Sequence, residues 1–479
     1  MPQLKVLQYG EGNFLRGFAD WMIDAANRAG VTDIGVAICK PIEYGSLDAL
    51  KAQDCAYNVV LKGIVDGKAS ENLQTVKSVV SCADCYAEYD KYAAYARESV
   101  LRFVISNTTE AGITYDDSDR LSMAPPKSFP GKLTKLLYER YIAFNGDMDK
   151  GLIMLPVELI DDNGKKLKEC VFKLASLWEL PEGFIAWLDS ACLFCSTLVD
   201  RIVTGYPATD AFKYWERLGY EDKLIVAGEP FALWVIESDK PELVQAEFPL
   251  DKAGNPVIFT DNMRPYRERK VRVLNGAHTG TVPAAYLAGL DTVSECVNDP
   301  VIRAYMDKLV YDEIAPTVPL PPDEVKAFAD AVMERFANPY IRHELMSIAL
   351  NSVSKWKARI LPSLLDSYNR NGKLPRLLTF SFAALLAFYR DGKLTADGSL
   401  ALQRAEGPYT VRDDKAVTEF FAGCFGMGSG EYVKAVAGNA AFWGMDLGTL
   451  DSFNEMVEGY LNDIKEKGMR EAVKMMVEA

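Results

Sequence analysis

The first forty residues pass from an apolar run through a glycine turn into a helical pattern, and this order constrains the fold more than any other feature of the chain. The run LKVLQYG ends in glycine, and large apolar side chains recur at helical spacing over the next twenty residues. Gly30 ends the predicted helix, and DIGVAICKP supplies a second β-branched run. The order predicts a βαβ unit, in which a crossover helix joins two parallel strands.

Further apolar runs alternate with helical stretches as far as about residue 250. They are YNVVLKGIV, LRFVISNTT, GLIMLPVEL and LIVAGEPFALWVIE. The alternation predicts an α/β fold with a doubly wound, mainly parallel sheet covered on both faces. From Lys270 onward the segments have helical patterns. We therefore predict an α/β domain over 1–250 and a mostly α-helical domain over 251–479.

The charge balance bears on the partners of the chain. With 53 Lys+Arg against 67 Asp+Glu, the formal net charge is −14, which disfavours binding to nucleic acid or to anionic membranes. The apolar run from Leu377 to Tyr389 is shorter than the roughly 20 residues of a membrane-spanning helix, so it predicts a buried helix. The N-terminus lacks a secretory pattern. We expect a cytoplasmic protein, and the sequence does not indicate its oligomeric state.

Nine cysteines include two CxxC pairs, Cys82/Cys85 and Cys192/Cys195. The pairs are much further apart than the roughly 15–20 residues that separate the two halves of a zinc ribbon, and no histidine lies near either pair. Apolar residues surround the second pair. We expect reduced thiols in the core and no metal site.

The first glycine turn follows a predicted strand and opens a predicted helix, which is the position of a dinucleotide-binding turn. There, helix N–H groups attract a pyrophosphate. Leu15 replaces the third glycine of the usual motif, so an ordinary strand-to-helix turn fits equally well. The candidate cofactor-binding residues of this segment are Gly10, Gly12, Asn13, Phe14 and Arg16.

The run RFVISNTTEAG ends in small polar residues. In an open α/β sheet, ligands bind beyond the carboxyl ends of the strands, so these side chains could border a cofactor crevice. A polar turn explains them equally well. The candidates are Ser106, Asn107, Thr108 and Thr109.

RPYRERKVRVLNGAHTG contains one of only two histidines in the chain. In a regular α-helix, Lys270, Asn275 and His278 would lie at about 0°, 140° and 80°, and so could border one face. A desolvated lysine near arginines can act as a proton donor or acceptor, and the other two residues could donate hydrogen bonds to a developing alkoxide. An amphipathic basic helix with a buried histidine is the alternative.

Several segments, in the same order along the chain, resemble the polyol-specific long-chain dehydrogenases, the mannitol dehydrogenase family. They are GEGNFLRGF, SNTTEAG, STLVDRI, EPFALWVIE, KVRVLNGAH and RFANPYIRH. The resemblance implies a Rossmann-type dinucleotide-binding domain over 1–250 and a helical substrate and catalytic domain over 251–479. It also implies NAD as hydride carrier and no catalytic metal. It assigns the acid/base role to Lys270, with Asn275 and His278 beside it, and places a second substrate-site lysine at Lys355.

QYGEGNFLRGF, LPVELIDDNG and LNSVSKWKARILPSL are most similar to the family members that reduce tagaturonate. A keto-uronate substrate would need a cationic clamp, for which Lys355, Arg359 and Arg342 are candidates. Fructuronate or an uncharged ketose such as fructose is the alternative substrate, and a metabolite-binding protein without catalysis is the alternative class.

Two positions depart from the expected pattern. Mannitol-type members have an oxyanion-site asparagine where this chain has Leu159, so that site must be built differently here. Lys40 ends the second predicted strand, where an acidic residue would bind the ribose of NAD and a basic one would suit the 2′-phosphate of NADP. Lys40 alone favours NADP slightly, whereas the resemblance implies NAD, which we adopt.

Overall fold

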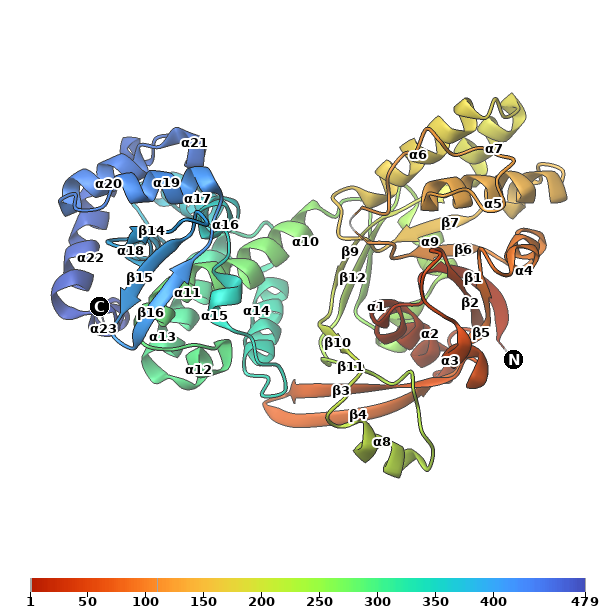
Figure 1. Ribbon diagram of the computed structural model, residues 1–479, viewed down its shortest axis with the longest axis horizontal. Coiled ribbons are helices and arrows are strands. Elements are labelled where there is room, and N and C mark those ends of the chain that lie inside the picture. Colours follow the sequence, from red (N-terminus) through yellow and green to blue (C-terminus); the bar gives the residue numbers. More distant parts are fainter. Residues whose placement is uncertain (1, 110, 479) are drawn as a thin grey trace. The chain divides into compact units, whose positions relative to one another are not determined.

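The computed structural model describes residues 2–109 and 111–478 (Figure 1). The chain divides into two compact units, Met1–Met263 and Arg264–Ala479. The division lies somewhat beyond the boundary expected near residue 250.

The N-terminal unit is built on a six-stranded parallel sheet. In spatial order its strands are β5 (Val79–Asp84), β2 (Ile34–Lys40), β1 (Gln3–Tyr9), β6 (Phe103–Ser106), β7 (Ile153–Pro156) and β8 (Leu193–Phe194). The chain builds outward from β1 in one direction and then, from β6, in the other. This reversal is the topological switch point at which α/β sheets bind their ligands. The predicted Rossmann-type sheet is confirmed.

Helices cover both faces of this sheet (Figure 1). Because side chains alternate along a strand, Val6 of β1 packs in one core and Leu7 and Tyr9 pack in the other. The first core contains α1 (Asn13–Gly17) and α2 (Ala19–Arg28), with α3 (Asp48–Ala52) at its border. The second contains α4 (Tyr89–Ala94), α5 (Phe129–Ala143), α6 (Asn163–Leu177) and α7 (Glu182–Ala191). The sheet is therefore doubly wound, as predicted.

Two smaller sheets take up strands that were expected in the main sheet. One contains β10 (Val203–Gly205), β11 (Val226–Gly228), β3 (Tyr57–Val65) and β4 (Lys68–Val76), with α8 (Ala211–Leu218) between β10 and β11 in the chain. The other contains β13 (Val257–Thr260), β12 (Leu233–Glu237) and β9 (Ser196–Asp200), with α9 (Pro241–Glu247). The YNVVLKGIV run pairs instead with β4, because Asp66 and Gly67 form a tight hairpin turn with positive φ at both residues.

The C-terminal unit is mostly helical. Its helices that lead to the site are α10 (Arg264–Arg269), a π-helical turn η4 (Lys270–Asn275), α11 (Gly276–Leu287), α14 (Pro322–Phe336), α15 (Leu345–Ile348) and α16 (Ser352–Arg359). The others are α12 (Val293–Asn298), α13 (Pro300–Lys308), the π-helical η5 (Leu309–Ile314), α17 (Leu361–Asn371), α18 (Arg376–Phe388), α19 (Lys415–Gly423), α20 (Ser429–Ala437), α21 (Ala440–Trp443), α22 (Phe453–Lys467) and α23 (Met469–Glu478).

Helix α18 contains all of the apolar run noted in the sequence except Tyr389, its C-cap, and is almost entirely buried, as predicted. It packs against α11 and α22. Across the described part of the chain, no helix combines the length and the apolar character that crossing a membrane requires.

The mostly helical character of this unit is confirmed, but the segment between α18 and α19, where helical patterns were expected, contains strands. There, β14 (Lys393–Leu394), β15 (Leu400–Arg404) and β16 (Gly407–Val411) form an antiparallel sheet. Leu400 and Leu402 are buried whereas Gln403 is exposed, which is the alternation of a half-buried strand. Gly398 and Gly407, both with positive φ, allow the chain to reverse.

Candidate active site

The glycine turn lies where β1 and β6 end. The Gly10 N–H donates to the Cys39 carbonyl at 3.0 Å, and the Asn107 N–H donates to the Tyr9 carbonyl at 3.1 Å. Gly10 has φ +120°, and a Cβ there would lie 3.0 Å from the Asn107 carbonyl oxygen. Only glycine suits this position. Asn107 and Gly10 thus bring the two predicted cofactor segments together.

Gly12 has a different role from Gly10. It precedes α1 with an extended backbone, and a Cβ there would meet no atom within 4 Å. The fold itself therefore does not need a glycine at this position. Open space beside a helix start at the switch point of the sheet is the arrangement by which a backbone approaches a phosphate group.

Arg16 stabilises the glycine turn by hydrogen bonds. Its side chain is buried, and its nitrogens donate to the Glu11 carbonyl at 3.1 Å, to the Asn13 side-chain oxygen at 2.7 Å and to the Leu224 carbonyl. Burial lowers the pKa of Arg16 from its usual value. With these donors engaged, the geometry favours a supporting role for Arg16, and its direct contact with a phosphate stays a prediction.

The neighbouring Phe14 is partly buried and stacks on Phe18, with ring centroids 5.0 Å apart. Phe14 therefore anchors the start of α1 to the core, and the exposed Asn13 borders the turn.

The polar end of β6 is organised by Glu158, which the sequence did not single out. The buried Glu158 carboxylate accepts hydrogen bonds from the Ser106 hydroxyl at 3.0 Å, and from the Thr108 N–H and hydroxyl at 3.0 and 2.9 Å. Burial raises the pKa of Glu158 even though these hydrogen bonds oppose the shift. An acidic residue directly after the apolar run of β7 was the signal available in the sequence.

Thr109 follows in a left-handed conformation, with φ +78°. The adjacent Leu159 is 65% exposed, so its apolar side chain does not pack in the core of the unit.

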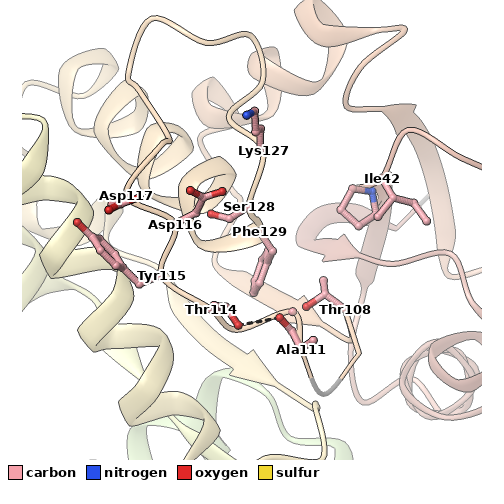
Figure 2. Close-up of a pocket in the computed structure, with 12 residues that line it drawn as sticks. Ile42, Thr108, Ala111, Thr114, Tyr115, Asp116, Asp117, Lys127, Ser128 and Phe129 are labelled. Carbon is pink, nitrogen blue, oxygen red and sulfur yellow. Dashed lines mark hydrogen bonds between the residues drawn. The ribbon is translucent and has the colours of Figure 1, made fainter.

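A cavity of about 570 Å³ lies at the same end of the sheet. Figure 2 shows Ile42, from the loop after β2, on one side and Phe129 on the other, with Thr108 and Ala111 below them in this view. The other labelled residues that line the cavity are Thr114, Tyr115, Asp116, Asp117, Lys127 and Ser128. This volume falls within the range of small-molecule sites. A ligand that starts at the glycine turn could extend into it.

Lys270 and Asn275 mark the two ends of η4, where the helix widens into a π-turn. The expected regular α-helical spacing is therefore wrong here, because π-helical hydrogen bonds run from i to i+5. Helix α16 packs against both η4 and α11. Gly276 allows this approach, since a Cβ there would lie 3.2 Å from the Arg359 carbonyl oxygen. Such π-turns are frequent at functional sites.

His278, on α11, faces the second histidine of the chain. The rings of His278 and His343 lie 5.1 Å apart, and the His278 ring packs on Phe336 at 4.2 Å. Burial holds the pKa of His278 well below its usual range, and positive neighbours act in the same direction. Those neighbours are His343, Arg335, Arg359 and Lys355. His278 is therefore a neutral imidazole, which can donate one hydrogen bond.

Lys355 and Arg359 form the cationic pair of this site. The Lys355 ammonium donates to the Ile348 carbonyl at 2.9 Å, and Arg359 donates to the Thr279 hydroxyl at 3.3 Å. Among the described residues neither forms a salt bridge, although Asp413 acts on Lys355 from a distance. Burial lowers the pKa of both. A part-buried cationic pair without a carboxylate partner is suited to binding an anion.

The structure does not bring Arg342 into this group. Its side chain is exposed and forms an ion pair with Glu344. His343, which the sequence did not single out, takes the place beside His278 instead.

All nine cysteines are buried and free. Burial raises the pKa of Cys192 and of Cys195 to about 12, so these thiols are protonated at neutral pH. Within residues 2–109 and 111–478, no group of three or more histidine, cysteine or acidic side chains is arranged to hold a metal ion.

Comparison with known proteins gives the class to which this fold and site correspond. Residues 4–252 match the mannitol dehydrogenase Rossmann domain, and residues 262–465 match the mannitol dehydrogenase C-terminal domain. The chain belongs to the mannitol dehydrogenase family.

Among individual relatives, the altronate oxidoreductase of Shigella flexneri is 45% identical over 98% of this chain and 96% of its own length. The protein of the same name from Escherichia coli K12 matches equally well.

Two solved structures share the fold. Pseudomonas fluorescens mannitol 2-dehydrogenase, a ternary complex with NAD and D-mannitol, has a TM-score of 0.64 and 20% identity over 100% of this chain and 95% of its own. A D-sorbitol dehydrogenase has a TM-score of 0.76 and 19% identity over 98% of this chain and 95% of its own.

Proposed function

We propose that this protein is an NAD-dependent oxidoreductase that transfers a hydride between NADH and a keto-uronate, reducing tagaturonate to altronate and catalysing the reverse reaction. The name of its 45%-identical relatives, altronate oxidoreductase, supports the reaction. The cationic pair Lys355 and Arg359, close to His278, supports a substrate with a carboxylate. Neither member of the pair has a carboxylate partner among the described residues. The carboxylate of a uronate supplies that partner.

The N-terminal unit is proposed to bind the cofactor. Gly10 and Gly12 would admit the pyrophosphate at the start of α1, with Asn13, Phe14 and Arg16 holding the turn. The Glu158-bound segment Ser106–Thr109 would border the nicotinamide side, and the cavity beside Ile42 would take the adenosine end. When bound, NADH supplies the hydride.

In the C-terminal unit, Lys270 is proposed to be the general acid and base. During reduction its ammonium gives a proton to the carbonyl oxygen of the substrate, and in the reverse direction its amine takes a proton from the hydroxyl group. Asn275 and His278 donate hydrogen bonds to the same oxygen as negative charge develops on it. Because His278 is neutral, it serves as a donor and leaves the proton transfer to Lys270.

The test of this proposal is NADH oxidation with a panel of tagaturonate, fructuronate, fructose and tagatose. We expect the highest kcat/KM with tagaturonate. A preference for fructuronate or a neutral ketose would reassign the substrate within the family. Absence of turnover with the whole panel would favour a metabolite-binding protein.

The cofactor half has a separate test. Gly12→Val should weaken NADH binding by at least about tenfold, because the side chain enters the space that the pyrophosphate needs. The fold should persist, since a Cβ at Gly12 meets nothing within 4 Å. An unchanged NADH dissociation constant in the folded variant would refute this placement.

A further inference from the structure

Lys40 is the basic residue at the end of β2, yet its charge is already engaged inside the protein. The side chain is 1% exposed, and its ammonium lies 3.0 Å from the Asp84 carboxylate at the end of β5. The same ammonium donates to the Ile42 carbonyl at 2.6 Å and to the Tyr44 carbonyl at 3.1 Å. Because an ammonium has three N–H donors, all the donors of Lys40 are used.

A second carboxylate, Glu11 of the glycine turn, faces the same place. A Cβ on Gly45 would lie 3.7 Å from a Glu11 carboxylate oxygen and 4.0 Å from the Lys40 side chain. Glu11 is affected by the charges of both Lys40 and Asp84, which act on its pKa in opposite directions, while burial raises it. When all three groups are ionised, they carry one net negative charge.

The position of these groups relates them to the cofactor. In dinucleotide-binding folds, the residue at the end of the second strand meets the adenosine ribose, and a basic residue there accommodates the 2′-phosphate of NADP. Here Pro41 and Ile42, directly after Lys40, line the cavity in Figure 2. A 2′-phosphate would approach two carboxylates and a lysine with no spare donor, and a charged group without partners is strongly disfavoured.

We infer that Glu11, Lys40 and Asp84 together select NAD(H) over NADP(H). Asp84 neutralises the one basic residue that could bind a 2′-phosphate, Lys40 holds the loop after β2 by its two carbonyl contacts, and Glu11 repels the added phosphate. This inference rests on the proposed cofactor site. Under this inference, the preference for NAD(H) depends on the Lys40–Asp84 ion pair. The presence of Lys40 alone therefore does not indicate which nucleotide is bound.

The test is the dissociation constant of NADH and of NADPH, measured by calorimetry without substrate. We expect wild-type protein to bind NADH at least about 100-fold more tightly than NADPH. Asp84→Asn frees the charge of Lys40 and should improve NADPH binding relative to NADH by about tenfold or more, the worth of one charge-assisted hydrogen bond. Adding Lys40→Met to Asp84→Asn should remove that gain.

Two further variants show whether the change in selectivity depends on the position of the carboxylate. Asp90→Asn removes the same charge from an exposed position on α4 and should leave the NADPH:NADH ratio unchanged. Glu11→Gln leaves the hydrogen bonds of Lys40 in place and should improve the ratio by a smaller factor, about threefold.

An unchanged ratio in both Asp84→Asn and Glu11→Gln would overturn the inference, and so would a gain that survives Lys40→Met. If wild-type protein binds NADH but the variants leave the NADPH:NADH ratio unchanged, only the inferred role of these three residues is refuted. If wild-type protein binds neither nucleotide, the proposed function is refuted as well.

Discussion

The glycine turn of the N-terminal unit and the His278 site of the C-terminal unit differ in how their polar groups are satisfied. Around the turn, Arg16, Lys40 and Glu158 all form hydrogen bonds within the protein. Around His278, the charges of Lys355 and Arg359 have no ion-pair partner among the described residues. The charged groups named at the turn thus have partners within the protein, whereas the cationic pair of the second region has no carboxylate partner among the described residues.

This difference indicates what each region can recognise. A turn whose side chains are engaged offers its backbone N–H groups and a fixed shape, which suit a pyrophosphate. A part-buried cationic pair offers charge, which suits a carboxylate. Substitutions at the two regions should therefore affect different measurements: dissociation constants of NADH at the first, turnover and substrate choice at the second.

The largest effect should follow from Lys270→Ala. Removing a positioned acid/base group should lower kcat by about 10²–10⁴ while NADH still binds, because the proposed cofactor site is in the other unit. Steady-state kinetics and NADH titration measure both properties. Lys357→Ala, an exposed lysine on α16, is the control and should keep normal turnover. Loss of NADH binding in Lys270→Ala would contradict the division of roles.

Asn275→Ala and His278→Ala should each lower kcat by up to about 10²–10³, as expected when one donor to a developing alkoxide is removed. The loss should appear in both kcat and kcat/KM, since the interaction strengthens in the transition state. A rise in KM alone would instead assign these residues to ground-state binding.

Lys355→Met should act on substrate choice. We expect the ratio of kcat/KM for tagaturonate over tagatose to fall by about 10–100-fold, the worth of a hydrogen bond between charged groups. Lys357→Met removes a lysine two positions away and should preserve the ratio. Equal losses for both substrates would make Lys355 a general structural or catalytic residue.

Asp20, behind the glycine turn, should have the smallest effect on turnover and a pH-dependent effect on stability. Burial raises the pKa of Asp20 to about 7, although Tyr57 and Gln8 donate hydrogen bonds to it. The folded state thus holds this proton more tightly than the unfolded state, whose carboxyl has a pKa of about 3.9. Stability should fall as pH rises from about 4 to about 7 and level off above.

Asp20→Asn should remove this contribution. The measured quantity is the Tm of the variant minus the Tm of the wild type. This difference should be a few degrees larger at pH 8 than at pH 4.5. A Tm difference that is independent of pH would show that Asp20 does not titrate in this interval.

Local patterns predicted much of this molecule. The βαβ opening, the buried α18 and the order of the two units follow from hydrophobic periodicity and from glycine positions. The resemblance pointed to Lys355 and His278, which the structure brings close together. These features depend on residues that are close in the sequence or on a motif, so the sequence of this chain was sufficient to predict them.

The rest depends on contacts between distant segments. Asp84 neutralises Lys40 from another strand, and Glu158, just after β7, accepts hydrogen bonds from the end of β6. The sequence showed the acidic residues themselves, but it could not show which distant groups they contact. The π-turn at Lys270 has no reliable sequence signature, and it changed the expected helical positions. Arg342 was chosen by charge alone, and a local partner, Glu344, takes that charge.

The pH profile of altronate oxidation by wild-type protein and by Lys270→Ala tests the proposed acid/base role of Lys270. We expect kcat of the wild type to rise with pH through an ionisation that the variant lacks, and the residual rate of the variant to be lower by about 10²–10⁴. A variant that keeps near-normal kcat with the same ionisation would show that Lys270 is not the acid/base group.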